Sequence, residues 1–471
     1  MPFDKLLLTI CMLFACCSLS LADSKPIMVI ELFRHGARAP YGDSWDINKA
    51  WTDRIGELTS AGMRMHYLLG KTLAQEYSHL LATYDPKQIS IFSSDVNRTI
   101  MSAYSQLFGM FSPGTSSLTE DQGKIAVPPG LQYSNVSEFI SDNYSLPKGI
   151  QPAPVHMVEP ISDYSLAPAV SCVNFFAVTG DSYTSPAFTE YLNITNSTMN
   201  LIAQIAKHFN LSEPDIWAGS ALADMLITNH YENIPSPFNV TYGSKEWYDI
   251  QFLGDWLITY VFTGPVKALQ LMGYPLFARM FDLLDGKLNG TFNKSFVLLS
   301  AHDVNVLTML AVFDTVTADC LRDVYLGKVN SSLCVYPGYS ANVITELYND
   351  TATPYVKFKY NGVYLNPCNT SDNSCTLEAY KRLVNKKLQN YNLTAWRIEC
   401  GVSQDTPTPP QPKPTPDPKP DDNSSNNSAL IAVIVVLGVI ITIELAVLIM
   451  IIRKPSKKVS SGSNYSSLIM A

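Results

Sequence analysis

Residues 27–40 read IMVIELFRHGARAP, and this stretch indicates the fold. Residues 27–33 are mostly apolar, which is typical of a short strand buried in a sheet. The heptapeptide RHGARAP at residues 34–40 then lies on the loop that leaves the carboxyl end of this strand. Open α/β sheets bind their ligands at that end, so the heptapeptide is a candidate binding site.

The side chains of the heptapeptide suit phosphate chemistry. Arg34 and Arg38 can each grip phosphate oxygens with a forked guanidinium group, and His35 between them can attack phosphorus as a nucleophile. Gly36 would let the backbone approach a bound anion closely. A histidine beside an arginine at a strand end is, however, more often a surface group that forms salt bridges, so this motif alone is weak.

Two further segments strengthen the phosphate interpretation. Residues 88–93 (QISIFS) and 296–300 (FVLLS) also look like buried strands, and they are followed by DVNRT at 95–99 and AHD at 301–303. Three predicted strands thus end in residues suited to phosphate chemistry, whereas core strands ordinarily end in turn-forming residues. An isolated His-Asp pair would more simply be a helix start with an aspartate in its first turn.

Together these motifs resemble those of the histidine acid phosphatase family, in particular the prostatic and lysosomal acid phosphatases of animals. The family signature is RHGxRxP followed by a distant HD pair, and both stand unaltered at residues 34–40 and 302–303. SDVNRT at residues 94–99 is similar to the segment that carries the family's third phosphate-binding arginine. Residues 58–66 resemble the first helix after the signature, and the similarity extends from about residue 25 to 400.

The resemblance implies a role for each matched residue and a phosphohistidine intermediate. The implied catalytic residues are His35 as nucleophile and Asp303 as proton donor, and the implied phosphate ligands are Arg34, Arg38, Arg98 and His302. Neither a metal nor another cofactor is expected, because the arginines supply the positive charge. The expected substrate is a small phosphate monoester or a phosphoprotein, and the family's habit of forming homodimers is carried over as an expectation.

Other functions remain open at this point. A phytase-like inositol polyphosphate phosphatase would use the same core, but its leaving-group side would be expected to carry several basic residues, and residues 114–292 hold few. A phosphoglycerate-type mutase would normally be cytosolic. The exported part of the chain could also be a receptor that has lost catalysis, although both His35 and Asp303 are present.

The alternation of elements predicts an α/β fold with a mixed, mainly parallel central sheet flanked by helices. Thr59 is the expected cap of a helix that ends near residue 77, with Met63, Tyr67, Leu68 and Leu73 on one side. Residues 114–292 are expected to form a smaller, mainly helical lobe. Its helix-like runs are 198–209, 217–229 and 247–272, and a hairpin is expected later from 342–348 and 355–360.

The two ends of the chain predict an exported protein held by one membrane span. Residues 429–452 are almost wholly apolar and long enough to cross a bilayer, and the basic residues after them place the C-terminus in the cytoplasm. The predicted segments are a signal peptide at 1–22, a phosphatase ectodomain at 23–402, a proline-rich stalk at 403–428, a single C-terminal transmembrane helix at 429–452 and a cytoplasmic tail at 453–471.

Two features of the C-terminal segments bear on location. Glu444 inside the span is either functional or protonated and merely tolerated. YSSL at residues 465–468 resembles the sorting signal of lysosomal membrane proteins, so Tyr465 and Leu468 would contact a clathrin adaptor, unless the tail has no receptor. The expected location is the lysosomal or endosomal membrane, or alternatively the plasma membrane, with the catalytic domain lumenal or extracellular.

Cysteine use and charge agree with export. Of nine cysteines, three lie in the predicted signal peptide, and the other six imply three disulfides, for which 15 pairings exist. Proximity favours Cys368 with Cys375, and the family has a short-loop disulfide in this region. Many Asn-x-Ser/Thr sequons indicate a glycosylated surface, although Asn97 is expected to be unmodified. A formal net charge of −8 argues against nucleic acid as a partner.

Overall fold

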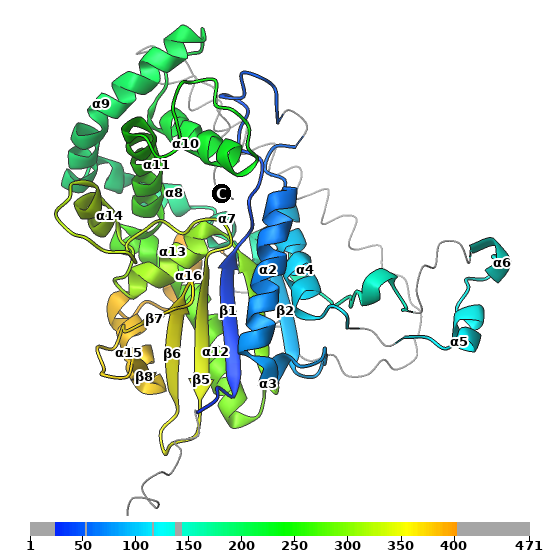
Figure 1. Ribbon diagram of the computed structural model, residues 1–471. Coiled ribbons are helices and arrows are strands. Elements are labelled where there is room, and N and C mark those ends of the chain that lie inside the picture. The colour runs from blue at the N-terminus through cyan, green and yellow to red at the C-terminus, as the bar shows by residue number, and fades with distance from the viewer. Residues whose placement is uncertain (1–23, 52–53, 115–116, 137–143, 403–471) are drawn as a thin grey trace, which may run out of the picture. The chain divides into compact units, whose positions relative to one another are not determined.

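The computed structural model describes residues 24–51, 54–114, 117–136 and 144–402. Its centre is one eight-stranded sheet in the order β3-β2-β4-β1-β5-β6-β7, with β8 also paired to β6 (Figure 1). The strands are β1 (Met28–Arg34), β2 (Ile89–Ser94), β3 (His156–Val158), β4 (Phe296–Ala301), β5 (Asn342–Tyr348), β6 (Tyr355–Tyr360), β7 (Val363–Leu365) and β8 (Ser374–Thr376). The predicted strands and the hairpin of β5 and β6 are confirmed.

The sheet is mixed, as predicted, but only one half of it is parallel. Strands β1, β2, β3 and β4 are joined by parallel pairs. Strand β5 pairs antiparallel with β1 and begins an antiparallel half that includes β6, β7 and β8. The expectation of a mainly parallel sheet therefore holds only for the half that carries the sequence motifs, because the short connections after β5 allow hairpins alone.

Helices cover both faces of the sheet. The longer ones are α2 (Ser60–Glu76), α4 (Asn97–Met110), α9 (Pro186–His208), α10 (Ile216–Tyr231), α11 (Lys245–Thr263), α12 (Val266–Asn289), α13 (Asp303–Val312) and α15 (Leu377–Lys387). The shorter ones are α3 (Ser78–Leu81), α5 (Glu120–Ile125), α6 (Tyr133–Val136), α7 (Pro168–Ser171), α8 (Phe175–Thr179), α14 (Ala318–Tyr325) and α16 (Leu393–Cys400), and the 3-10 turns are Pro147–Gly149, Pro160–Ser162 and Gly180–Thr184.

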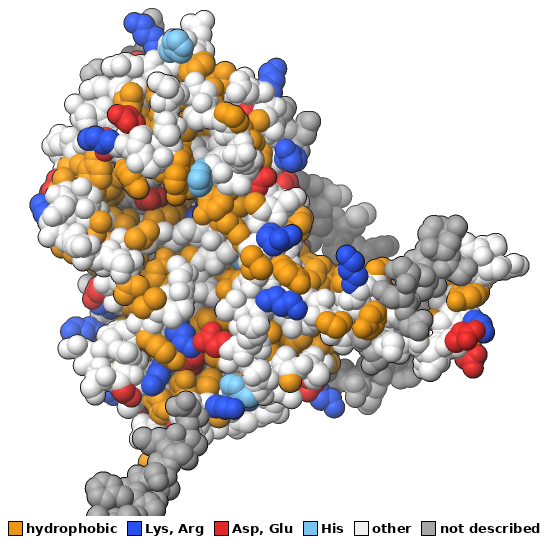
Figure 2. All heavy atoms as spheres, in the orientation of Figure 1, with side chains coloured by type: hydrophobic (Ala, Val, Ile, Leu, Met, Phe, Trp, Pro, Cys, Tyr) orange, Lys and Arg blue, Asp and Glu red, His pale blue; other side chains and the backbone are white. Residues whose placement is uncertain are grey.

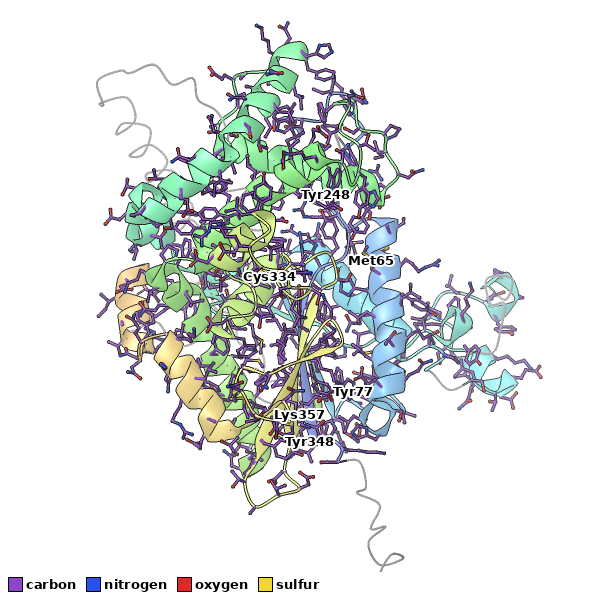
Figure 3. All side chains as sticks on the ribbon, turned by 60° about the vertical axis from the view of Figure 1, so that its left-hand side comes forward. Met65, Tyr77, Tyr248, Cys334, Tyr348 and Lys357 are labelled. Atoms are coloured by element: carbon purple, nitrogen blue, oxygen red, sulfur yellow. A yellow bond between two sulfur atoms is a disulfide. The ribbon has the colours of Figure 1, made fainter. Side chains whose placement is uncertain are left out.

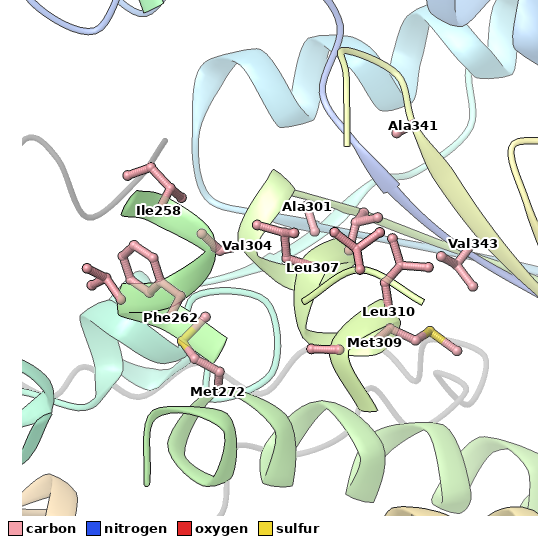
Figure 4. Packing of buried hydrophobic residues seen from close by; sticks show 14 of the residues in the cluster. Ile258, Phe262, Met272, Ala301, Val304, Leu307, Met309, Leu310, Ala341 and Val343 are labelled. Atoms are coloured by element: carbon pink, nitrogen blue, oxygen red, sulfur yellow. The ribbon is translucent and has the colours of Figure 1, made fainter. Parts of the chain in front are cut away.

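Alternating side chains of β1 enter two separate cores. Val29 and Phe33 pack with apolar residues of α2 and α4, whereas Ile30 and Leu32 pack with the larger core on the opposite face. This alternation is what a strand buried on both faces requires. Figure 4 shows part of the larger core, where side chains from α11, α12, α13, β4 and β5 meet.

The region between β2 and β4 is mostly helical, but it also contributes β3 at one edge of the sheet. In Figure 1, α9, α10 and α11 lie beyond the carboxyl ends of the parallel strands. Two tryptophans in the loop after the signature fasten this loop to α10, since Trp45 Nε1 donates to Ala218 O at 2.8 Å and Trp51 Nε1 donates to Asn229 Oδ1 at 2.8 Å. The helical region therefore covers the end of the sheet that carries the motifs.

Helix α2 begins and ends as predicted, with Thr59 as its cap, but of the four apolar or aromatic residues expected on one side only Leu73 is buried. Its buried residues are Gly62, His66, Gly70 and Leu73, whereas Met63, Tyr67 and Leu68 are exposed. The outward face of α2 is a mixture of hydrophobic and basic side chains (Figure 2). Small residues, and not the largest apolar ones, face inward because the backbones of α4 and of the loop that carries the signature pack directly against the backbone of α2.

The space around two glycines shows how closely these backbones pack. A Cβ on Gly36 would lie 2.4 Å from Gly62 O, and a Cβ on Gly70 would lie 2.0 Å from Gln106 O. The Gly36 N–H donates to Ser102 Oγ at 3.1 Å. Gly36 is thus required for packing of the signature loop on α2 and α4, which is a different reason from the anion contact expected from sequence.

The predicted helix over residues 247–272 is two helices. Helix α11 ends at Thr263 and α12 begins at Val266, with Gly264 and Pro265 between them. Pro265 has no N–H to continue the hydrogen bonds of α11, and its fixed φ suits the position before a new helix. The apolar pattern runs through this break because both helices bury one face in the same core.

The opposite end of the sheet holds a polar cluster centred on Glu346. Its carboxylate accepts hydrogen bonds from Tyr77 Oη at 2.7 Å, Tyr348 Oη at 3.0 Å and Lys359 Nζ at 2.7 Å. Figure 3 shows Tyr77, Tyr348 and Lys357 close together at this end. These bonds satisfy a buried charge, so the cluster is structural and lies away from the motif-bearing loops.

A second buried carboxyl, Glu31, lies in the middle of β1. Glu31 is fully buried and accepts hydrogen bonds from Asn342 Nδ2 at 2.8 Å and from Gln106 Nε2. Burial raises the pKa of Glu31 from 4.5 to about 7, against the opposing effect of these hydrogen bonds. The folded protein therefore keeps this proton to a higher pH than the unfolded chain does.

Replacing Glu31 by glutamine should make stability less dependent on pH. The contribution of the Glu31 proton is full below about pH 4.5 and is lost as the pH rises through 7, a loss of about 3 kcal/mol. Urea unfolding between pH 4.5 and 7.5 should give a shallower fall in the free energy of unfolding for Glu31→Gln. The exposed Glu378→Gln is the control, and an equal slope in Glu31→Gln and the native protein would refute the assignment.

None of the helices within the described ranges is both long and apolar enough to cross a membrane. The predicted signal peptide, stalk, transmembrane helix and cytoplasmic tail lie outside the described residues, as do Glu444, Tyr465 and Leu468.

Candidate active site

Three neighbouring parallel strands bring the predicted site residues to one edge of the sheet. Arg34 is the last residue of β1, Arg98 is the second residue of α4 after β2, and His302 and Asp303 join β4 to α13. Because the strand order is β2-β4-β1, the three loops are adjacent. All six predicted residues, including His35 and Arg38, are buried.

The imidazole of His35 is oriented by its own loop. Nδ1 lies 2.9 Å from Gly36 O and donates to it, which leaves Nε2 without a proton. Nε2 is buried and has no hydrogen-bond partner within the described part of the chain. Burial lowers the pKa of His35 well below its usual value, and the charges of Arg98, Arg34 and Arg38 lower it further. Burial and these charges therefore both favour the neutral ring, in which Nε2 has a free lone pair.

Arg34 is held between the loop before β5 and the start of α13. Its Nη1 donates to Pro337 O at 2.6 Å, and its Nη2 forms an ion pair with Asp303 Oδ2 at 2.9 Å. The guanidinium carbon lies 4.5 Å from the ring centroid of Tyr339. These contacts fix the plane of the guanidinium group, so its remaining N–H groups have a defined direction.

Arg38 and Arg98 are fixed by different partners. Arg38 forms a two-bond ion pair with Asp224 of α10, at 2.9 and 3.0 Å. Arg98 Nη2 donates to Tyr41 Oη at 3.3 Å, and the Tyr41 ring lies within 5.2 Å of both guanidinium carbons. Burial lowers the pKa of Arg98 to about 10, so this arginine remains charged at any acidic or neutral pH.

His302 lies edge-on to His35, with 5.8 Å between ring centroids. Its Nε2 lies 2.9 Å from Ser94 Oγ, and Ser94 Oγ lies 2.9 Å from Thr99 Oγ1. The Nδ1 of His302 is buried and has no partner among the described residues. When Ser94 donates to Nε2, Nδ1 carries the proton and is a hydrogen-bond donor.

Five of the six predicted residues share one property. Each has a buried polar atom without a protein partner within the described ranges, and these atoms are Arg34 Nε, His35 Nε2, Arg38 Nε, Arg98 Nε and His302 Nδ1. Buried polar atoms are nearly always satisfied, so five in one cluster make it a candidate ligand site. Three guanidinium groups and an imidazole donor around one imidazole lone pair suit an oxyanion with an electrophilic centre.

Several residues of the site were not predicted from sequence. Asp224 and Asp255 come from α10 and α11, and Tyr336 and Tyr339 come from the loop before β5. Burial and the charge of Asp303 raise the pKa of Asp255 to about 7, against the opposing charge of Arg34. No motif marks these positions. Tyr41, which contacts Arg38 and Arg98, was also not predicted, although its position directly after the signature could have indicated it.

Three disulfides lie within the described ranges, and they join Cys172 with Cys400, Cys320 with Cys334, and Cys368 with Cys375. The predicted Cys368–Cys375 pair is confirmed. The Cys320–Cys334 disulfide joins α14 to the loop that carries Tyr336 and Tyr339; Cys334 is labelled in Figure 3. Three disulfides are characteristic of a protein that matures in the secretory pathway. Within the described residues, no group of three or more His, Cys, Asp or Glu side chains could hold a metal ion.

Sequence comparison finds the same family that the motifs resemble. The profile of the histidine phosphatase superfamily (branch 2) matches residues 27–361. The chain is 25% identical over 386 residues to prostatic acid phosphatase of Mus musculus, which covers 79% of this chain and 88% of that protein. It is 25% identical over 397 residues to lysosomal acid phosphatase of Xenopus laevis, which covers 81% of this chain and 80% of that protein.

Solved structures agree on the fold. The phytase from Citrobacter braakii superposes with a TM-score of 0.54 at 16% identity, covering 80% of this chain and all of the phytase. The apo form of Hafnia alvei phytase gives a TM-score of 0.54 at 12% identity, covering 78% of this chain and 98% of that chain. At these identities the similarity concerns the fold alone.

Proposed function

Because this chain belongs to the histidine phosphatase superfamily (branch 2), we propose that it is an acid phosphatase that hydrolyses phosphate monoesters through a phosphohistidine. One observation carries the proposal. The buried, unpartnered Nε2 of His35 is surrounded by unpartnered donors from Arg34, Arg38, Arg98 and His302. A phosphate group placed among these donors presents its phosphorus to the His35 lone pair.

The first chemical step forms a bond between His35 Nε2 and phosphorus and breaks the bond between phosphorus and the leaving oxygen. The charge on the equatorial oxygens is stabilised by Arg34, Arg38, Arg98 and the Nδ1–H of His302. Asp303, whose Oδ2 lies 2.9 Å from Arg34 Nη2, gives its proton to the leaving oxygen and releases an alcohol. The products of this step are phosphohistidine and a carboxylate.

The second step returns the enzyme to its starting state. A water oxygen attacks phosphorus while the Asp303 carboxylate takes the water proton, and the bond from phosphorus to His35 Nε2 breaks. The first step delivers a proton to the leaving oxygen, and acidic solution supplies that proton. The lowered pKa of His35 favours the neutral, nucleophilic form of its ring. These two properties together support activity at acidic pH.

The acid phosphatase assignment is tested by turnover of p-nitrophenyl phosphate across pH 3 to 9, with and without tartrate. Turnover is expected to be highest below neutral pH, because the first step delivers a proton to the leaving oxygen and the lowered pKa of His35 favours its neutral form. Absence of turnover at every pH, with phosphate still bound, would favour a receptor that retains the site without the reaction.

A phytase-like function is the second candidate because the fold neighbours are phytases. The basic residues of the helical region argue against it. Lys124 pairs with Glu120, Lys245 with Asp249, and Lys267 with Glu399, all outside the site cluster. Two acidic residues, Asp224 and Asp255, instead face the arginines. Inositol hexakisphosphate should therefore be a poorer substrate than p-nitrophenyl phosphate, and the reverse order would favour the phytase.

The proposal extends to the location of the enzyme. The order of segments is a signal peptide at 1–22, an ectodomain at 23–402, a stalk at 403–428, one transmembrane helix at 429–452 and a tail at 453–471. The disulfides of the ectodomain support export. Under this proposal the catalytic domain faces the lumen or the exterior, and the tail sorts it to lysosomes. Release of the protein by alkaline carbonate, without detergent, would refute the membrane anchor.

A further inference from the structure

Asp224 of α10 makes three polar contacts with the loop that carries the signature. Its Oδ1 lies 2.9 Å from Arg38 Nη2, and its Oδ2 accepts from Arg38 Nη1 at 3.0 Å and from the Tyr41 N–H at 2.8 Å. The Arg38 side chain is 1% exposed and that of Asp224 is 20% exposed. A carboxylate with three bonds to one loop fixes both the position of the loop and the plane of the guanidinium group.

The remaining donors of Arg38 can be counted. A guanidinium group has five N–H bonds. Arg38 Nη1 donates one to Asp224 and one to Ala39 O at 3.0 Å, and Nη2 donates one to Asp224. The two that remain are Nε–H and the second Nη2–H, and they lie side by side on one edge of the group. The Nε atom is buried and has no partner within the described ranges.

From this arrangement we infer that Asp224 is a positioning residue for phosphate binding. It occupies the outer edge of the Arg38 guanidinium group and thereby turns the Nε and Nη2 edge toward the phosphate. This inference rests on the proposed function, since it requires phosphate to bind beside His35. It also gives the helical region a part in binding the phosphate itself, because Asp224 belongs to α10.

A purely electrostatic role for Asp224 predicts the opposite effect. A carboxylate beside Arg38 weakens the positive field that attracts the phosphate, so its removal would tighten binding. A positioning role predicts weaker binding, because an unrestrained Arg38 no longer presents two aligned donors. The sign of the change in phosphate affinity therefore distinguishes the two roles.

The test compares Asp224→Ala and Asp224→Asn with the native enzyme. The measured quantity is the inhibition constant of inorganic phosphate against p-nitrophenyl phosphate turnover, together with kcat and KM. Asp224→Ala should raise the inhibition constant by about 10- to 100-fold, the value of one or two hydrogen bonds to a charged group. Asp224→Asn keeps one acceptor oxygen and should give a smaller rise, which also covers the case in which the alanine variant does not fold.

Two controls separate positioning from a general loss of stability. Asp285 also accepts two bonds, from Lys381 Nζ at 2.8 and 2.9 Å, but it lies on α12 facing α15, so Asp285→Asn should leave the inhibition constant unchanged. In an Arg38→Lys background, adding Asp224→Ala should raise the constant little further, because the group that Asp224 positions is already gone.

An unchanged or lower inhibition constant in both Asp224 variants would overturn the inference. An unchanged inhibition constant would mean that Asp224 is a structural contact only. A lower inhibition constant would mean that Asp224 opposes the binding of phosphate. Failure of the native enzyme to bind phosphate or to turn over any ester would instead overturn the proposed function. The two failures are thus separated by the behaviour of the native enzyme.

Discussion

Replacement of His35 by alanine is expected to abolish ester hydrolysis, lowering kcat by at least about a thousandfold. The reason is that the Nε2 lone pair of His35 is the proposed bond-forming group, and the lowered pKa of the ring favours its neutral form. The measurement is steady-state turnover of p-nitrophenyl phosphate by the purified variant. Alanine removes no hydrogen bond except that to Gly36 O, so the variant should fold.

Phosphate binding separates a catalytic effect from a structural one in this variant. The donors of Arg34, Arg38, Arg98 and His302 remain, so His35→Ala should still bind inorganic phosphate by calorimetry. His79→Ala is a matched control, since His79 contacts Pro26 O and lies outside the cluster, and it should keep full activity. Substantial turnover by His35→Ala would show that another group attacks phosphorus.

The second large effect is expected for Asp303→Asn, and it should depend on the substrate. An alkyl ester has a poor leaving group that needs a proton, so its kcat/KM, which reports the first step, should fall by about 10²- to 10⁴-fold. An activated aryl ester leaves as a stable anion, so its kcat/KM should be affected far less, while the second step that both esters share also loses its base. Both rates are measured on one preparation of the variant, so losses in folding cancel in their ratio. Equal losses on the two esters would remove Asp303 from the role of proton donor.

The parallel half of the fold could be predicted because its sequence signals are local. The apolar runs that became β1, β2 and β4 are buried on both faces, and a strand of this kind is recognisable without its neighbours. The polar residues after each run then meet at one edge because the strands are parallel and adjacent. Motif and topology together therefore predicted which six side chains lie near one another.

The inward face of α2 could not be predicted in the same way. Amphipathic patterns identify the largest apolar residues as buried, and Met63, Tyr67 and Leu68 fit that pattern. The structure instead buries Gly62 and Gly70, because the neighbouring backbone approaches too closely for side chains there. Close backbone packing of this kind depends on tertiary contacts that no local pattern records.

Asp224 was missed for a similar reason. Its partner Arg38 is 186 positions away in the sequence, and an aspartate on a helix is ordinarily a solvated surface group. Asp255, Tyr336 and Tyr339 likewise reach the site from segments without a motif. The proposed phosphate-binding residues follow family motifs, whereas the groups that contact and orient them come from the helical region and the loop before β5.

The central claim is that phosphate is transferred through His35, and rapid acid-free quenching of the enzyme with ³²P-labelled substrate tests it most directly. The account predicts one labelled peptide, which contains His35, carries an acid-labile and base-stable phosphate, and is absent from His35→Ala. Label on another residue would contradict it. Turnover of the aryl ester by Asp303→Asn without any labelled peptide would also contradict it, because in this variant the aryl ester should still react with His35 whereas release of an alkyl product is slowed.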